Sequence, residues 1–280
     1  MSLSILNNIP SLAAQNQLTI TGSNLQRTLF RLSSGSRINS GADDAAGLAI
    51  ADGLRANISA LTQSSRNAND GVGMLQVADG ALAQVTTLLN RAVTLATESS
   101  TGTVSDSQRT ALDAEYQAIT NEIDRIGTKT TFNGTGVFSA TATNIYLSDS
   151  TSTGNSTISV TTGALSKTDV GDGTTALDLS KDDLKSAATA QTALGDINTA
   201  IANVAGRRGA LGAAINRLGS AVSVMNNQVQ NLSAAEDGIR AADIAQEVAN
   251  MTKFSILNQT GISSLAQANQ MQQSVLALLK

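Results

Sequence analysis

The chain has 280 residues, contains no His, Cys or Trp, and carries a formal net charge of −4 at pH 7. The absence of His and Cys removes the commonest general base, zinc-hydrolase motifs, disulfide bonds and thiolate chemistry. The weak negative charge gives no reason to expect a nucleic acid or an anionic membrane as a partner, and we expect no catalytic, cofactor or metal site.

The apolar residues favour packing between helices over a thick globular core. They make up 41% of the chain, yet only two Tyr and four Phe are present, whereas a compact core of this size normally buries several large rings. The sequence has no run of 18 apolar residues, so we expect no transmembrane helix. The start of the chain also lacks the basic residues and continuous apolar run of a cleaved secretory signal.

Both ends of the chain are nearly uncharged. No charged residue precedes Arg27, and the 26 residues between Lys253 and Lys280 carry none, although about a quarter of residues in ordinary domains are charged. Frayed tails are the alternative, but disordered segments are rich in charge and poor in Leu and Ile. We therefore expect two helices that pack on each other and become fully ordered on assembly. Their apolar stripes are Leu18, Leu25, Leu29 and Leu32, and Leu265, Ala268, Met271, Val275 and Leu278.

A glycine- and serine-rich stretch, residues 31–54, separates the first uncharged segment from a long apolar repeat. Asp43 and Asp44 directly precede that repeat, where a carboxylate caps a helix. Arg37 and Asn39 can bind carbonyl or carboxylate groups of a neighbour. A phosphate-binding loop is excluded because neither a preceding strand nor a Gly-Lys-Ser/Thr ending is present. We interpret the stretch as an assembly joint.

A seven-residue apolar repeat predicts one long helix from about Asp44 to about Thr97. A second row, Ala78, Val85 and Ala92, indicates neighbours on two sides. A shorter helix follows, with Leu112, Tyr116, Ile119, Ile123 and Ile126 at helical spacing. The long repeat consists of Leu54, Leu61, Ala68, Leu75, Leu82, Leu89 and Ala96.

Residues 130–182 change character, and a heptad pattern then returns. The Thr-, Ser- and Gly-rich composition and the runs "NIYL" and "TISV" predict one or two hairpins and a solvent-exposed loop. The heptad that follows spans nearly 40 residues, longer than usual for a helix of a compact bundle. Its seam is Leu194, Ile197, Ile201, Val204, Leu211, Ile215, Leu218, Val222, Met225, Val229 and Leu232, with Arg208 in the vacant position.

Four long motifs resemble the bacterial flagellins: "LSSGSRINSGADDAAGLAIA", "LTQSSRNANDGVGMLQVADGAL", "NEIDRIGTKTTFNG" and "SLAQANQMQQSVLALL". The resemblance covers residues 3–138 and 183–279. It departs from the family at Ala241, where an acid is usual, and at Gln272, where many members have Pro. Together with the helical patterns, it predicts a mainly α fold, an elongated rod of long antiparallel coiled-coil helices with a small β-rich insertion at one end.

The resemblance implies a domain division as well. Residues 1–42 and 237–280 would be terminal helices of the inner filament core, and residues 43–129 and 183–236 a helical rod. Residues 130–182 would be a hairpin and a variable, solvent-exposed insertion.

The resemblance further implies a structural protein of swimming motility. It would be exported unfolded by the flagellar type III apparatus without a cleaved signal, and would polymerise with itself into an extracellular filament. Its partners would be an export chaperone, the export apparatus, the filament cap and hook-junction proteins. The alternative is the hook–filament junction protein of the same export system. Flagellins with a metalloprotease insertion need His-Glu-x-x-His, and this chain has no His.

The resemblance also points to an animal innate immune receptor as a partner. Arg91 and Leu95 on the long helix, and Leu112 and Glu115 on the next, match the family's receptor motif. Val93 and Thr94 stand where strongly recognised members have Arg and Glu, so the motif is partial. Ordinary surface residues between helices or subunits are the equal alternative.

Overall fold

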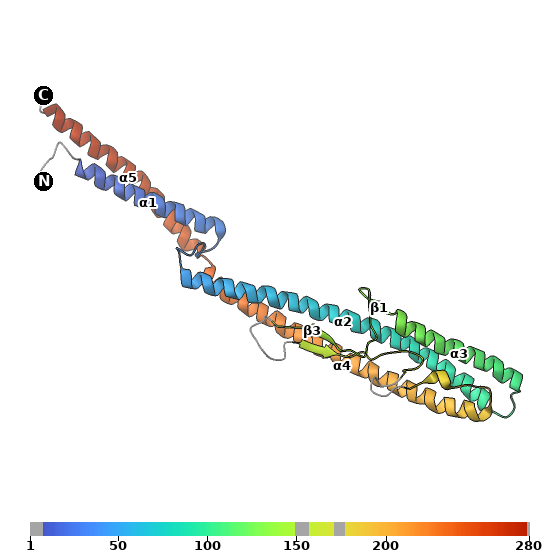
Figure 1. Ribbon diagram of the computed structural model, residues 1–280. Helices are drawn as coiled ribbons and strands as arrows, with labels where there is room; N and C mark the ends of the chain where they lie inside the picture. Colours follow the sequence, from blue (N-terminus) through green and yellow to red (C-terminus); the bar gives the residue numbers. More distant parts are fainter. Residues whose placement is uncertain (1–7, 149–156, 171–176, 279–280) are drawn as a thin grey trace. The chain divides into compact units, whose positions relative to one another are not determined.

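The computed structural model describes residues 8–148, 157–170 and 177–278. These residues form five α-helices: α1 (Ile9–Ser34), α2 (Ala45–Ser100), α3 (Asp106–Lys129), α4 (Ala187–Arg240) and α5 (Ile244–Leu278) (Figure 1). The long helices pack antiparallel, α1 on α5 and α2 on α4. This confirms a mainly α fold of long antiparallel helices with a small β content.

The chain divides into two compact units. The first unit comprises residues 1–56 and 231–280, and the second unit comprises residues 57–230. Both α2 and α4 contribute to each unit.

In the first unit, α1 and α5 pack through matching heptad rows. The half-buried or buried rows are Ser11, Ala14, Leu18, Thr21, Leu25, Thr28 and Leu32 on α1, and Met251, Phe254, Asn258, Gly261, Leu265, Ala268 and Gln272 on α5. Steps of three and four keep such a row on one side of a helix. A Cβ on Gly261 would lie 3.2 Å from Leu18 Cδ1, so the backbones approach closely there. The expectation that the two ends of the chain pack on each other is confirmed.

In the second unit, the long repeat of α2 forms the core. Leu75, Leu82 and Leu89 are fully buried, and so is the second row of Ala78, Val85 and Ala92. Two rows need two neighbours, and α3 and α4 both lie along α2 (Figure 1). α3 contributes Tyr116, Ile119 and Ile123 to this core, and a capping box of Ser105 and Gln108 starts the helix.

The 18 most apolar consecutive residues of α2 have a mean hydropathy of 1.2, which is enough by length and composition to cross a membrane. No membrane helix was expected from the sequence. The buried share of this window is 28%, while the rows of Leu75, Leu82 and Leu89 and of Ala78, Val85 and Ala92 are buried.

The buried face of α4 is broader than one seam. Ile197, Val204, Leu211, Leu218 and Met225 are buried at intervals of seven. The expected second row is half-buried at Leu194, Ile201, Ile215, Val222 and Val229. A row one residue earlier is buried instead: Ala193, Ala200, Arg207 and Ala214. The helix therefore packs on two sides. One buried row consists of large apolar residues and the other mainly of alanines.

Two short hairpins form in the middle segment, as predicted. β1 (Thr131–Phe132) pairs with β2 (Thr135–Gly136) through Asn133 and Gly134, whose φ angles are 49° and 78°. Positive φ at both turn residues is the reason for the Asn-Gly sequence. β3 (Thr143–Tyr146) pairs antiparallel with β4 (Thr157–Val160), in the register Thr143 to Val160.

Much of the segment expected to be solvent-exposed is packed instead. Arg207, 6% exposed, donates from Nη1 to Ala164 O at 2.7 Å, and Lys167 N donates to Asp124 Oδ1 at 3.3 Å. The segment is held because its apolar side chains enter the core of the second unit. They are Val137, Ile145, Val160, Leu165, Val170 and Leu179, all buried.

Candidate assembly site

The predicted joint spans residues 31–54, and the part of it between α1 and α2, residues 35–44, is what we call the joint from here on. This part is tied to the connection between α4 and α5. Gly35 ends α1 with a φ of 69°, a conformation that favours glycine. Arg37 N donates to Arg240 O at 2.6 Å, and Ala242 N donates to Gly35 O at 3.0 Å. The Arg37 guanidinium also donates to Ile239 O at 2.9 Å. Arg37 thus binds backbone carbonyls, and these belong to its own chain.

Asn39 and Asp43 hold the turn itself. The Asn39 amide donates to Ser34 Oγ at 2.9 Å and to Ser36 O at 2.8 Å. Asp43 Oδ2 accepts hydrogen bonds from Asn39 N, Ser40 N and Ser40 Oγ at 3.0–3.3 Å. The Ser40 hydroxyl, followed by the Asn39 backbone N–H, lowers the pKa of the Asp43 carboxyl below its ordinary 3.8. These bonds therefore stabilise the joint at neutral pH and are lost as the pH falls below about 3.8.

Asp44 caps α2 and faces two residues that the sequence analysis did not single out. Its Oδ1 accepts from Gly47 N at 2.9 Å, as an N-cap does. A Cβ on Gly47 would lie 2.8 Å from Ile38 Cδ1 and 2.5 Å from Asp44 Oδ2. Ile38 is 1% exposed. Two features of the sequence could have indicated these residues: Ile38 is a lone apolar residue in a polar turn, and Gly47 is a glycine in the first turn of a helix.

Ion pairs connect the joint to α5 and surround it. Arg31 lies 3.4 Å from Glu247, which is 8% exposed, and 3.6 Å from Asp43. One guanidinium therefore links the end of α1, the joint and α5. Other pairs in the first unit are Arg55 with Glu236 at 2.9 Å, and Arg240 with Asp52 and Glu236 at 3.8 Å.

Replacing both Asp43 and Asp44 with Ala is expected to reduce polymer yield strongly. Loss of the Asp44 cap alone costs about 0.5–2 kcal/mol, and loss of Asp43 leaves Ser40 N and Asn39 N without an acceptor. Sedimentation of polymerised protein measures the yield, and thermal unfolding by circular dichroism reports whether the second unit stays folded. Asp237→Ala, an exposed change on α4 in the same unit, is the control. Normal polymerisation of the double variant would mean that the joint is only a spacer.

The surfaces of α1 and α5 that face away from their shared seam are largely uncharged and carry large apolar side chains among amides and hydroxyls. We call them the outer faces. Leu18, Leu25 and Leu265 are half-buried in the seam, whereas Leu29 is 45% and Met271 is 57% exposed. The side chains of Val275 and Leu278 lie outside the described residues. The outer faces expose Ile9, Leu12, Ile20, Leu29 and Phe30 on α1, and Val248, Ile256, Leu257, Ile262 and Met271 on α5.

The residues expected to meet an innate receptor divide into a surface pair and more buried residues. Arg91 and Glu115 form an exposed ion pair at 2.7 Å between α2 and α3, and the Arg91 hydrogen bond lowers the pKa of Glu115. Leu112 is half-buried. Leu95 is 1% exposed, so its side chain belongs to the core and is not presented to a receptor.

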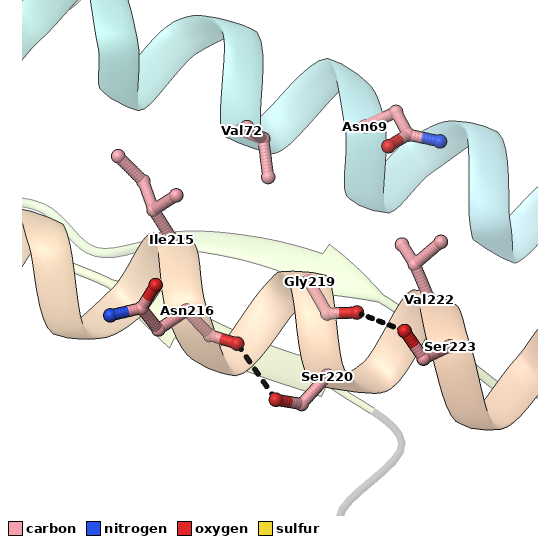
Figure 2. Close-up of a pocket in the computed structure, with 8 residues that line it drawn as sticks. All are labelled: Asn69, Val72, Ile215, Asn216, Gly219, Ser220, Val222 and Ser223. Carbon is pink, nitrogen blue, oxygen red and sulfur yellow. Dashed lines mark hydrogen bonds between the residues drawn. The ribbon is translucent and has the colours of Figure 1, made fainter.

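An open groove of about 590 Å³ runs between α2 and α4 in the second unit (Figure 2). Its Ser220 and Ser223 hydroxyls donate to Asn216 O and Gly219 O, at 3.0 and 3.1 Å. The lining contains no ionisable side chain: Asn69, Val72, Ile215, Asn216, Gly219, Ser220, Val222 and Ser223. A nucleophile without a base does not support catalysis. Within the described ranges, no three acidic, His or Cys residues are placed to hold a metal ion.

Comparison with known proteins identifies both helical regions. Residues 5–143 match the bacterial flagellin N-terminal helical region, and residues 194–279 match the bacterial flagellin C-terminal helical region. The chain is 38% identical to a flagellin of Halalkalibacterium halodurans, 37% to the flagellar filament 33 kDa core protein of Treponema phagedenis and 35% to a flagellin of Bacillus subtilis. Each alignment covers 99% of both chains. The chain belongs to the bacterial flagellins, structural proteins of the flagellar filament that are not enzymes.

Proposed function

We propose that this flagellin polymerises with copies of itself through the outer faces of α1 and α5, with the joint holding the two helices in register. The observation that carries the proposal is the pair of outer faces. Phe30, Ile9 and Leu12 on α1 are 60–66% exposed, and Ile256 on α5 is 59% exposed. Large apolar side chains exposed repeatedly along a helix mark an interaction site.

The energetics favour another copy of the chain as the occupant. Burying one large apolar side chain contributes about 1.5–3 kcal/mol. The described part of α1 carries only Arg27 and Arg31 as charged residues, and α5 carries only Glu247 and Lys253. Nearly uncharged helices can surround one another without burying unpaired charges, which would be costly. Repetition of one contact between identical chains produces an open helical polymer when the rotation does not close.

We further propose the partners and the route that the family implies. These are a flagellar export chaperone, the type III export apparatus, the filament cap and the hook-junction proteins. The outer faces are uncovered in the single chain and would be the surface for a chaperone before assembly. Arg91 and Glu115 are the exposed pair available to an innate immune receptor.

The test is polymerisation of the purified protein at high concentration, followed by sedimentation and electron microscopy. The wild-type chain is expected to form filaments. Phe30→Ser is expected to raise the critical concentration at least tenfold, since an exposed ring in the monomer becomes buried in the polymer. Gln26→Ser, an exposed polar change on the same helix, is the control.

Phe30→Ser should leave the unfolding of the monomer unchanged, because the ring is 62% exposed there. Wild-type protein that forms no filaments would contradict polymerisation through the outer faces alone. An unaltered critical concentration for Phe30→Ser would remove the outer face of α1 from the interface.

A further inference from the structure

Two exposed cations interrupt the otherwise uncharged surfaces of α1 and α5 in the first unit. They are Arg27 on α1 and Lys253 on α5. The other charged residues of the described parts of these helices, Arg31 and Glu247, lie 3.4 Å from each other. Within the described ranges, no ion pair of this unit contains Arg27 or Lys253. Lys253 Nζ lies 6.0 Å from the centre of the Phe254 ring, a contact that leaves its charge in place.

The antiparallel packing of α1 on α5 places both cations at one level of the helix pair. Arg31 on α1 lies opposite Glu247 on α5. Because the helices run in opposite directions, the residue four positions before Arg31 lies opposite the residue four positions after Glu247. Arg27 therefore lies opposite residue 251, which is two residues from Lys253. We call Arg27 and Lys253 the cationic turn.

The joint and the adjoining connection between α4 and α5 carry two exposed acids, Asp44 and Asp243. Asp44 caps α2, and Asp243 Oδ1 caps α5 by accepting from Gln246 N at 3.1 Å. Each cap uses one oxygen, so the other oxygen can accept a further donor. No ion pair in the described parts of the unit contains either acid. The Arg37 guanidinium of the joint donates to Ile239 O instead. We call Asp44 and Asp243 the joint carboxylates.

These opposite charges lie at different levels of the same unit. Lys253 and Asp243 are ten residues apart along α5, which is about 15 Å. In a polymer that surrounds α1 and α5 with other copies, the cationic turn would lose contact with water. A charge without a partner is costly in such a place. The acid on α5 at the nearer level, Glu247, is 8% exposed and already bound to Arg31.

We propose that the cationic turn of one copy binds the joint carboxylates of a neighbouring copy, two positive charges against two negative charges. This inference rests on the proposed polymerisation through the outer faces. Asp243 directly precedes Ile244 and lies five residues before Val248, and both apolar side chains are exposed. The carboxylates therefore continue the outer face of α5.

The consequence is a defined register between copies. The two charged regions differ, so their contact is heterologous and can repeat from copy to copy. Apolar faces attract in many relative positions, because the hydrophobic effect is not directional. Complementary charges favour the position in which opposite signs meet and disfavour the others.

Neutral variants of the full chain test the proposal through the critical concentration for polymerisation. Arg27→Gln with Lys253→Gln removes the cationic turn. Asp44→Asn with Asp243→Asn removes the joint carboxylates but keeps both helix caps, since Asn caps about as well as Asp. Each double variant is expected to raise the critical concentration about tenfold, because the opposite charges of the neighbouring copy remain without a partner. Combining all four changes removes both sets of charges, so this chain should polymerise better than either double variant.

Asp237→Asn is the matched control. Asp237 is an exposed acid on α4 in the same unit and lies outside the joint, so the wild-type critical concentration should be retained. Thermal unfolding of the monomers, followed by circular dichroism, should match the wild type in every variant, because the changed residues are exposed.

The outcomes separate this contact from the proposed function. Losses that multiply in the fourfold variant would show that the two sets of charges act independently, and would overturn the contact. A loss only on removal of the cations would assign them a different anion and would also overturn it. If neither double variant changed the critical concentration while Phe30→Ser still raised it, the ion pairs would be wrong and the outer faces would remain the interface.

Discussion

Replacing Leu218 with Ala is expected to lower the free energy of unfolding of the second unit by about 2–5 kcal/mol. Leu218 is fully buried and lies in the middle of the buried row of α4, between Leu211 and Met225. The unit has few large rings that could move into the space left behind, since only Tyr116 among its aromatic residues is fully buried within the described ranges. Urea unfolding followed by circular dichroism measures the loss.

Two neighbouring positions on α4 are matched controls. Ile215→Ala removes as many carbon atoms as Leu218→Ala, but Ile215 is half-buried at the edge of the open groove (Figure 2). Its loss should therefore be smaller. Asn216 is exposed, and its change to Ala should stay within about 0.5 kcal/mol. A loss for Asn216→Ala larger than that for either apolar change would mean that α4 is rotated from the described register.

Replacing Gly127 with Ala is expected to destabilise the second unit by about 1–3 kcal/mol or more. Gly127 is buried on α3, and a Cβ there would overlap the backbone carbonyl oxygen of Leu165. The carbonyl cannot move by a simple rotation, because Arg207 holds the adjacent Ala164 O at 2.7 Å. The segment around Leu165 would have to leave α3 and expose its apolar side chains. Urea unfolding and the rate of proteolysis within residues 157–170 report these two effects.

Gly209→Ala on α4 is the matched control, and its expected effect on stability has the opposite sign. A Cβ on Gly209 would meet no atom within 4 Å, so the change should stabilise the monomer by about 0.5–1 kcal/mol through helix propensity. If Gly127→Ala also stabilised the chain, the packing of the middle segment on α3 would be wrong. That outcome would instead support the expectation that residues 130–182 are a variable, solvent-exposed insertion.

The helices and the pairing of the two ends could be predicted from local patterns in the sequence. Seven-residue spacing places Leu75, Leu82 and Leu89 on one side of a helix whatever the partner is. Asp44 before α2 and the Asn133-Gly134 turn are local signals, because each depends on backbone geometry within a few residues. The two uncharged ends were expected to pack on each other, because the apolar stripe of each helix needs a partner that buries it.

Contacts between groups far apart in the sequence became known only from the folded chain. Arg37 binds the carbonyls of Ile239 and Arg240, about 200 residues away along the chain, and no local pattern encodes that contact. Spacing alone favoured Ile201 and Ile215 over Ala200 and Ala214, yet the alanines are buried.

On that side of α4 the middle segment is bound at Arg207, which donates to Ala164 O at 2.7 Å. In the same segment Leu165 is buried. Periodicity shows that a residue has a covered side, but the shape and chemistry of what covers it come from segments remote in sequence.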